Sequence, residues 1–292
     1  MIQFIDRQSG TICTEKVYGW QALKALYGDG PLAWLLQRLV CCFPFVSRFM
    51  GYWMKRPASR KKIDPFIQQY GIAVAEFAEF KFESFNDFFI RKLKPECRPL
   101  VQGANRLAAP ADGRYLVYPK FTEFTAKRQK FCLRTLLQDD VYANRFREGS
   151  LLIARLCPTD YHRFHFPCDG MAHAPRLING LLHSVSPIAI CKNWAILSEN
   201  KRVVTEIETD SFGTVLYVEI GATGVGSIRQ TFSGPSRVAK GQEKGYFEFG
   251  GSCIVLLFEK NRISFDADLV ANTKRGYETL CRYGEGVLAR VS

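Results

Sequence analysis

The stretch that decides the fold is Gly245-Tyr246-Phe247-Glu248-Phe249-Gly250-Gly251-Ser252-Cys253-Ile254-Val255-Leu256-Leu257-Phe258. An alternating aromatic run leads into two glycines and a serine, and an unbroken apolar run follows. This pattern predicts two strands separated by a tight turn, in which the glycines supply positive φ and Ser252 is a turn-favouring residue. A second interpretation is that the peptide bond between Gly251 and Ser252 reacts, because a flexible glycine carbonyl lies beside a hydroxyl. The rest of the chain is needed to choose between them.

Length and composition limit the function classes. The chain has 292 residues, of which 47% are hydrophobic, and a formal net charge of +12. It is long enough for one large domain with a helical appendage, and its apolar fraction excludes a disordered chain. The positive charge favours a polyanionic partner, either nucleic acid, anionic lipid or an acidic small molecule. Ten cysteines occur without a Cys-x-x-Cys pair or a secretory signal, so we expect free thiols in a reducing cytosol.

The segment over residues 32–54, LAWLLQRLVCCFPFVSRFMGYWM, has the most unusual composition in the chain. Arg38, Arg48 and the central Pro44 argue against a membrane-spanning helix and predict two short helices. Tryptophan and tyrosine rings beside a basic cluster are typical of an interfacial anchor on anionic lipid. The alternatives are a buried helical hairpin with a solvated linker, or nucleic-acid binding, for which no motif is present. The cations that follow without an acidic residue are Lys55, Arg56, Arg60, Lys61 and Lys62.

The chain divides into a helical part and a β-rich part. Ser84 and Asp87 have the spacing of a capping box at a helix start. After Pro99, glycines, β-branched residues and short alternating runs dominate to about residue 265. We therefore expect an α+β protein with a helical, membrane-associating N-terminal region over 1–99. A body of mixed or antiparallel strands over 100–292 follows and ends in a C-terminal helix. The pattern predicts helices at residues 20–27, 66–80, 85–93 and 266–283.

Three groups of residues in the β-rich part carry candidate chemistry. Asp112 lies in a turn framed by proline and glycine, and His162 and His165 are two of only four histidines. With Ser252, the chain order Asp, His, Ser suggests a nucleophile triad. A strand follows Ser252, however, so this is not the nucleophile elbow of a serine hydrolase. No third ligand accompanies the histidines, so we expect no metal. An ordinary turn aspartate and satisfied core histidines are the alternative.

These residues lie within motifs that match a known family. From about Phe66 to Gly286 the chain resembles the phosphatidylserine decarboxylase proenzymes, which depend on a pyruvoyl group. Each motif is modest alone, but their order and spacing make the resemblance specific. The motifs are Ser84-Phe85-Asn86-Asp87-Phe88-Phe89-Ile90-Arg91-Lys92-Leu93-Lys94-Pro95, Pro110-Ala111-Asp112-Gly113, Tyr161-His162-Arg163-Phe164-His165, Val218-Glu219-Ile220-Gly221-Ala222, Val225-Gly226-Ser227-Ile228, Lys240-Gly241-Gln242-Glu243-Lys244-Gly245-Tyr246-Phe247 and Gly250-Gly251-Ser252.

The resemblance implies that the chain cuts itself. Ser252 Oγ would attack the carbonyl of Gly251 to form an ester, and β-elimination followed by hydrolysis would leave an N-terminal pyruvoyl group. His165 would be the general base, and Asp112 would orient and stabilise its imidazolium. The products would be a β chain of residues 1–251 and an α chain of residues 252–292, held together as a heterodimer. Higher assembly stays open.

The same resemblance implies the second reaction. Phosphatidylserine would form a Schiff base with the pyruvoyl carbonyl, lose its carboxylate as CO₂, and leave as phosphatidylethanolamine. No cofactor other than this covalent pyruvate is then needed. His162 would protonate the substrate carbon, with a structural role as its alternative. An enzyme with this lipid substrate would bind an anionic membrane surface as a peripheral protein on the cytoplasmic side, and we expect no nucleic-acid partner.

Some residues depart from the family pattern. Cys253 stands where family members usually carry threonine or serine, and a thiol is the poorer hydrogen-bond donor. His173 and His183 match no family role. Three other functions stay open at this point: a pyruvoyl decarboxylase of a soluble amino acid, a serine hydrolase that is not cut, and a non-enzymatic lipid-binding module.

Overall fold

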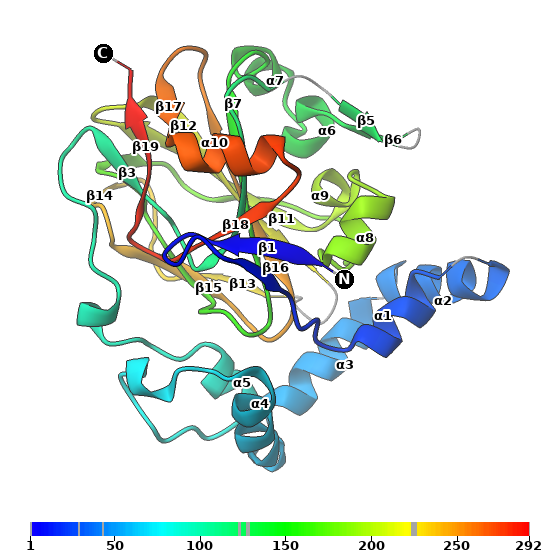
Figure 1. Cartoon of the computed structure of the whole chain (residues 1–292). Helices are drawn as coiled ribbons and strands as arrows, with labels where there is room; N and C mark the ends of the chain where they lie inside the picture. Colours follow the sequence, from blue (N-terminus) through cyan, green and yellow to red (C-terminus); the bar gives the residue numbers. More distant parts are fainter. Residues whose placement is uncertain are drawn as a thin grey trace.

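The centre of the molecule is a mixed sheet (Figure 1). The computed structural model describes residues 2–28, 30–42, 44–121, 124–126, 129–222 and 227–291. Neighbouring strands of this sheet pair antiparallel, except that β1 pairs parallel with β18. In spatial order the strands are β14 (Ser236–Val238), β9 (Gly170–Ala172), β11 (Arg202–Thr209), β12 (Gly213–Gly221), β16 (Ser252–Phe258), β7 (Ser150–Leu156), β4 (Gly113–Tyr118), β18 (Glu278–Cys281), β1 (Gln3–Asp6) and β2 (Ile12–Thr14), with β10 (Arg176–Ile178) paired to β11.

Smaller sheets pack on one face of the central sheet. Strands with period-two alternation have two distinct faces, and in β16 residues Ile254, Leu256 and Phe258 face this side. There they share a core with Phe164 and Phe247 of the first small sheet. That sheet is β13 (Ile228–Gln230), β15 (Glu243–Phe247) and β8 (Arg163–His165), and the second is β17 (Ile263–Phe265), β19 (Gly286–Arg290) and β3 (Arg106–Ala108). A separate hairpin joins β5 (Phe124–Ala126) and β6 (Gln129–Phe131).

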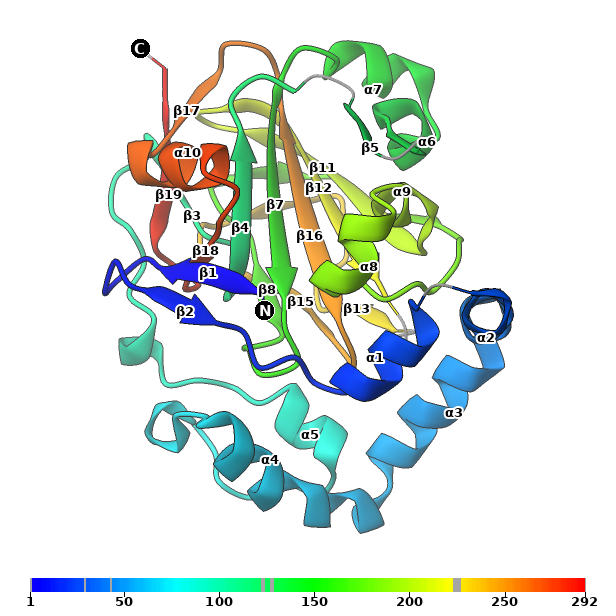
Figure 2. The same ribbon diagram turned by 45° about the vertical axis from the view of Figure 1, so that its right-hand side comes forward.

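Short helices cover the opposite face, as Figure 2 shows for α8 and α9. The alternate residues of β16, Cys253, Val255 and Leu257, pack in this second core. The covering helices are α6 (Leu133–Leu137), α7 (Asp140–Arg145), α8 (Pro187–Lys192) and α9 (Ile196–Glu199). A further helix, α10 (Ala267–Lys274), packs against β4 and β18. The predicted α+β class is confirmed.

The N-terminal helices lie below the sheets (Figure 1). Residues 54–93 of this region form most of a third, aromatic core, whereas Leu23 and Leu26 pack against the second core. Two short helices meet at Pro44 as predicted, and none of the helices in the described ranges has both the length and the apolar character needed to cross a bilayer. The helices are α1 (Trp20–Leu26), α2 (Pro31–Cys42), α3 (Pro44–Lys55), α4 (Ile63–Tyr70) and α5 (Phe85–Phe89), with 3₁₀ turns at Pro57–Lys62, Val74–Glu76 and Pro95–Cys97.

Two of the predicted N-terminal helices are shorter than the pattern indicated. Helix α4 ends at Tyr70 because Gly71 adopts a left-handed conformation, with φ of 64°, which terminates a helix. The predicted helix over 85–93 ends at Phe89. Ser84 caps that helix as predicted, by accepting the backbone N–H of Asp87.

The C-terminal prediction is wrong beyond Lys274. Gly276, with φ of 80°, ends the helix expected over 266–283, and the following chain forms β18 and β19 instead. Strand β18 pairs with β4 and with β1 of the N-terminal hairpin. Both ends of the chain therefore contribute strands, and the hairpin at residues 3–14 belongs to the central sheet.

Candidate active site

Ser252 begins β16, in the middle of the central sheet. Its register partners are Gly221 on β12 and Leu156 on β7. The side chain is fully buried, and its Oγ has no hydrogen-bond partner. A buried hydroxyl without a partner costs about 1–3 kcal/mol, so its presence calls for a reason beyond packing.

Ser252 lies where three neighbouring strands cross from one sheet to another. In the central sheet β16 lies between β12 and β7, and in the first small sheet β15 lies between β13 and β8. The chain runs directly from β7 to β8 and from β15 to β16, and β13 is the strand that follows β12. We call residues 248–251, which connect β15 to β16, the cleavage segment. The predicted turn is thus a bend between sheets, and β15 and β16 do not pair with each other.

The two glycines of the cleavage segment differ in what the fold requires. Gly250 has φ of 138°, a conformation that residues with a side chain rarely adopt. Gly251 has no such φ, and a β-carbon there would come no closer than 3.4 Å to its nearest neighbour, Cγ2 of Val185. Backbone conformation therefore explains glycine at 250. Neither conformation nor crowding explains why residue 251 is glycine. A reaction does explain it, because a carbonyl that a hydroxyl attacks needs to be unhindered.

His162 directly precedes β8 and lies beside the end of β15, where its carbonyl accepts the backbone N–H of Phe247. The ring stacks on Phe89 at 3.8 Å between centroids. Nδ1 lies 2.9 Å from the carbonyl oxygen of Asp160, which can only accept, so Nδ1 carries the proton and Nε2 does not. Nε2 is buried without a partner. Burial, with smaller contributions from the cations Arg91 and Arg114, lowers the pKa of His162 to about 3.

His165 lies three residues further, at the end of β8. Its ring stacks on Tyr283 at 3.8 Å, and its Nδ1 is buried without a partner. Burial lowers the pKa of His165 to about 3, while the negative charge of Asp112 acts in the opposite direction. The two histidines are therefore both neutral at pH 7, but only His165 has a carboxylate near enough to favour its protonated form.

Asp112 precedes β4 and is held by other partners. Arg98 donates two hydrogen bonds to its carboxylate, at 3.0 and 2.7 Å, and the backbone N–H of Tyr283 donates a third at 2.8 Å. Within the described ranges no hydrogen bond joins Asp112 to His165, or either histidine to Ser252. The structure therefore brings Asp112 and His165 together through Tyr283 and through charge, and it does not form the hydrogen-bonded chain of a triad.

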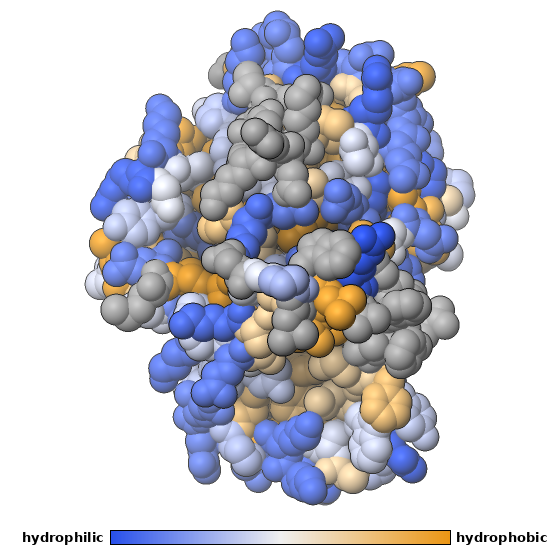
Figure 3. All heavy atoms as spheres, turned by 90° about the vertical axis from the view of Figure 1, so that its right-hand side faces the viewer, coloured by the Kyte–Doolittle hydropathy of each residue, from blue (hydrophilic) through white to orange (hydrophobic). Residues whose placement is uncertain are grey.

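A cavity of about 340 Å³ borders the cleavage segment. Gly250 and Gly251 form part of one wall, together with Phe249. Apolar side chains of α1, α2 and α3 also line the cavity, together with several charged and hydroxyl groups. Figure 3 shows the face of the molecule that carries these helices, where apolar side chains gather over the lower half. The residues that line the cavity from the helices are Ala22, Leu23, Leu26, Val40 and Met50, and the polar ones include Glu15, Arg155, Ser184 and Ser186.

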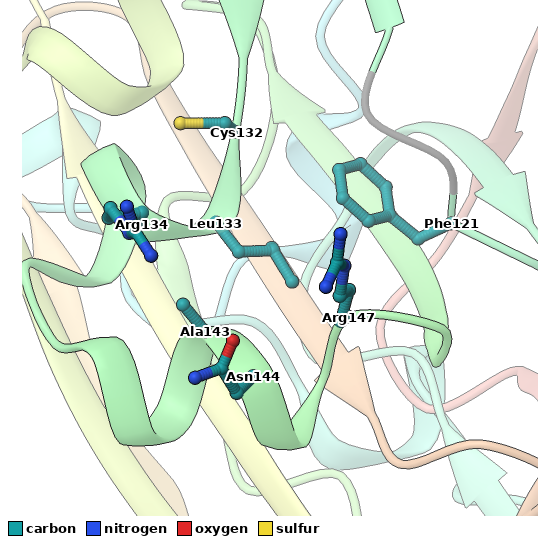
Figure 4. A pocket seen from close by; sticks show the side chains of 7 residues that line it. All are labelled: Phe121, Cys132, Leu133, Arg134, Ala143, Asn144 and Arg147. Carbon is teal, nitrogen blue, oxygen red and sulfur yellow. The ribbon is translucent and has the colours of Figure 1, made fainter.

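A second cavity, of about 320 Å³, lies between α6 and α7 (Figure 4). Its lining combines the polar side chains of Arg134, Asn144 and Arg147 with the apolar ones of Phe121 and Leu133. This cavity adjoins the start of β7, whereas Ser252 pairs with the last residue of that strand. At about 3.4 Å per strand residue the two places are roughly 20 Å apart, so this cavity cannot serve Ser252.

The remaining sequence candidates take no part in the site. His173 is half-buried and bonds Glu208 at 2.9 Å, and the backbone of His183 is bonded to Asn200. Cys253 points to the helix-covered face, away from the side chain of Ser252. Among the described residues, no cluster of histidine, cysteine and carboxylate side chains could hold a metal ion. The motif residues Val225 and Gly226 lie outside the described ranges.

Four residues near the site were not singled out from the sequence: Asn86, Lys244, Glu219 and Arg98. Asn86 of α5 accepts the backbone N–H of Phe249 in the cleavage segment, at 2.9 Å. Lys244 and Glu219 form a fully buried ion pair between the two sheets that Ser252 joins. Asn86, Lys244 and Glu219 lie in the family-like motifs, and those motifs are the sequence signal that could have identified them. Arg98 lies outside those motifs, and only the fold shows that it binds Asp112.

Comparisons with known proteins agree on one family. A family model described as phosphatidylserine decarboxylase matches residues 85–289. The phosphatidylserine decarboxylase proenzyme of Chlamydia muridarum (strain MoPn / Nigg) is 46% identical over 294 aligned residues, which cover 99% of this chain and 97% of its own length. The proenzyme of Chlamydia felis (strain Fe/C-56) is 45% identical over 98% of this chain and 97% of its own, and that of Chlamydia trachomatis serovar L2 is 44% identical over 99% and 97%.

Proposed function

This chain belongs to the phosphatidylserine decarboxylase family, and we propose that it is a proenzyme that cuts itself between Gly251 and Ser252 before it acts. The activity is the decarboxylation of phosphatidylserine to phosphatidylethanolamine. One observation carries the proposed cleavage site: a buried Ser252 hydroxyl without a hydrogen-bond partner follows a glycine that neither packing nor conformation requires.

Self-cleavage follows from the chemistry of those two residues. Ser252 Oγ attacks the carbonyl carbon of Gly251, the peptide C–N bond breaks, and an ester joins the two residues while the nitrogen keeps its place in β16. Removal of the Cα proton of Ser252 then expels the Gly251 carboxylate and leaves dehydroalanine. Hydrolysis of dehydroalanine releases ammonia and leaves a pyruvoyl group at residue 252. Chain 1–251 and chain 252–292 stay together because β16 remains paired with β7 and β12.

The two histidines suit different steps. A base that takes the Ser252 proton becomes a cation, and Asp112 favours that charge on His165. Arg91 and Arg114 disfavour it on His162. We therefore assign the cleavage step to His165, with Asp112 as the group that stabilises its imidazolium. No hydrogen bond links His165 to Ser252 in the uncut chain, so the two side chains have to come within hydrogen-bond distance before the proton can move.

His162 suits the decarboxylation step. A pyruvoyl group at residue 252 supplies the electron sink for loss of the substrate carboxylate. Nε2 of His162 has a free lone pair, since Nδ1 donates to the carbonyl of Asp160. Phosphatidylserine brings a carboxylate and a phosphate, whose negative charges favour a cationic His162 in this step only. Nε2 can then take a proton from the substrate ammonium group and return it to the substrate carbon after CO₂ has left. Its stacking on Phe89 fixes the direction in which Nε2 points.

The N-terminal helices supply a place for lipid. Large apolar side chains of α2 and α3 are exposed, among them Phe49 at 61% and Trp53 at 46%. Such a patch beside exposed cations fits the interface of an anionic bilayer. Side chains of these same helices line the cavity beside Gly251, and Lys55 of α3 binds Glu248 of the cleavage segment at 2.6 Å. The proposed site of action is therefore the cytoplasmic membrane surface, with phosphatidylserine entering along α1–α3.

The test of the proposed cleavage is the state of the purified full chain. Intact mass should give two chains, 1–251 and 252–292, and Ser252→Ala should give one uncut chain without decarboxylase activity. Ser150→Ala removes another buried serine hydroxyl, on β7, and as the matched control it should still give two chains. A folded wild-type protein that stays uncut, or a Ser252→Ala variant that is cut, contradicts the proposal.

A further inference from the structure

Helix α5 holds the cleavage segment from outside the two sheets. The side-chain Oδ1 of Asn86 accepts the backbone N–H of Phe249 at 2.9 Å, and both residues are buried. This contact joins residues that are 163 positions apart in the sequence. Because Phe249 directly precedes Gly250 and Gly251, the hydrogen bond fixes the chain two residues before the bond that is cut.

Aromatic packing strengthens this hold. The ring of Phe249 lies edge-on to Phe85 and Phe89 of α5, with centroids 5.3 and 5.2 Å apart. Helix α5 is itself anchored, because the N–H of Phe85 donates to Ser59 Oγ at 2.9 Å. Phe89 also stacks on His162. One short helix therefore sets the position of the cleavage segment and that of a proposed catalytic residue.

We propose that Asn86 is a positioning residue for self-cleavage, an inference that rests on the proposed function. On one side of the reacting bond, β16 fixes Ser252 through its pairing with β7 and β12. On the other side, Asn86 fixes Phe249. Only Gly250 and Gly251 are free to rotate between these two points. The carbonyl of Gly251 can then meet the Ser252 hydroxyl in few orientations, and limiting orientations in this way accelerates an intramolecular attack.

Removing the hydrogen bond should slow cleavage while the fold persists. With Asn86→Ala the N–H of Phe249 loses its partner and the segment is fixed at one end only. We expect the first-order rate of appearance of chain 1–251, followed by denaturing gel and intact mass, to fall at least about tenfold, which corresponds to about 1.4 kcal/mol in the barrier. Asn86→Asp keeps an oxygen in the same place and should cleave at close to the wild-type rate.

The matched control is Ser84→Ala. It removes the N-cap of the same helix, whose loss costs about 1 kcal/mol, but leaves the contact between Asn86 and Phe249. Its Tm should fall while its cleavage rate stays within about threefold of wild type. Hydroxylamine, which cuts esters, adds a second readout: it should release less chain 1–251 from Asn86→Ala than from wild type in the same time, since the ester forms more slowly.

The outcomes separate the inference from the proposed function. A wild-type chain that is cut, with Asn86→Ala cut at the same rate, overturns the role of Asn86 alone. So does a Ser84→Ala variant that is slowed as much as Asn86→Ala, since helix stability would then explain both. If Asn86→Ala does not fold, Asn86→Asp decides: a wild-type rate supports the inference and a tenfold loss overturns it. An uncut wild-type chain overturns the proposed function as well.

Discussion

The buried pair of Lys244 and Glu219 offers the most quantitative test of how the site is supported. Lys244 lies on β15 and Glu219 on β12, so the pair ties the small sheet to the central sheet next to the crossing that carries Ser252. Both side chains are fully buried, and Lys244 Nζ also donates to Gln230 at 2.8 Å. Burial lowers the pKa of Lys244 and raises that of Glu219, and their mutual attraction opposes both shifts. Four aromatic rings surround the ammonium group: Phe164, Phe166, Tyr217 and Phe232.

The perturbation is Lys244→Met. It removes one partner and leaves the carboxylate of Glu219 uncompensated in an apolar core, which costs about 3–5 kcal/mol. For a chain of this size that free energy corresponds to a drop in Tm of roughly 6–20 °C. The double variant Lys244→Met/Glu219→Leu removes both charges, and such replacements are close to neutral, so it should recover most of the loss.

The assay is thermal and urea unfolding in a Ser252→Ala background, where every molecule is a single chain. Lys260→Met is the control, because Lys260 and Glu148 form an exposed pair, 57% and 51% accessible, and such pairs contribute about 0–1 kcal/mol. A cost below about 1 kcal/mol for Lys244→Met would refute the reasoning. So would a double variant that is less stable than the single one.

Three further predictions follow from the site and the surface. Because the pKa values of His162 and His165 are lowered to about 3, the unfolded chain takes up protons first. The contribution of each histidine to the free energy of unfolding of the uncut variant should be fully present above pH 6.5 and fall toward pH 3, by about 1.4 kcal/mol per pH unit. Replacing either histidine by asparagine should reduce the slope of the free energy of unfolding against pH, measured by urea unfolding between pH 4 and 7. An unchanged slope would contradict the burial argument. Replacing Phe49 and Trp53 by serine should reduce sedimentation with anionic vesicles at least about tenfold, since each ring contributes about 1.5–3 kcal/mol when buried; equal sedimentation would count against the membrane surface. Cys253→Thr should change the cleavage rate less than about threefold by gel, because that side chain faces the other core, and a large change would show that residue 253 reaches the ester.

Local sequence patterns predicted the strands on both sides of Gly250 and the two helices that meet at Pro44. These depend on period-two and period-3.6 spacing and on proline, all of which act within a few residues. The patterns overestimated the helices that Gly71 and Gly276 end. In both cases a single left-handed glycine stops a run whose apolar spacing continues.

What the patterns could not show depends on contacts between distant segments. Strands β15 and β16, on either side of the cleavage segment, belong to different sheets. This depends on the pairing of β16 with β7 and β12, which nothing within residues 245–258 predicts. Residue types and motif order identified Ser252, His165 and Asp112 as candidates. The hydrogen bonds of Arg98 to Asp112, however, appear only when the chain has folded, and they explain why the aspartate does not bond the histidine.

The measurement that tests the central claim most directly is the intact mass of the smaller chain from purified wild-type protein. The account predicts a chain of residues 252–292 that is lighter by one ammonia than the same peptide beginning with serine, because residue 252 has become pyruvoyl. A fragment with a free serine at residue 252, a cut elsewhere, or one undivided chain of 292 residues would contradict it.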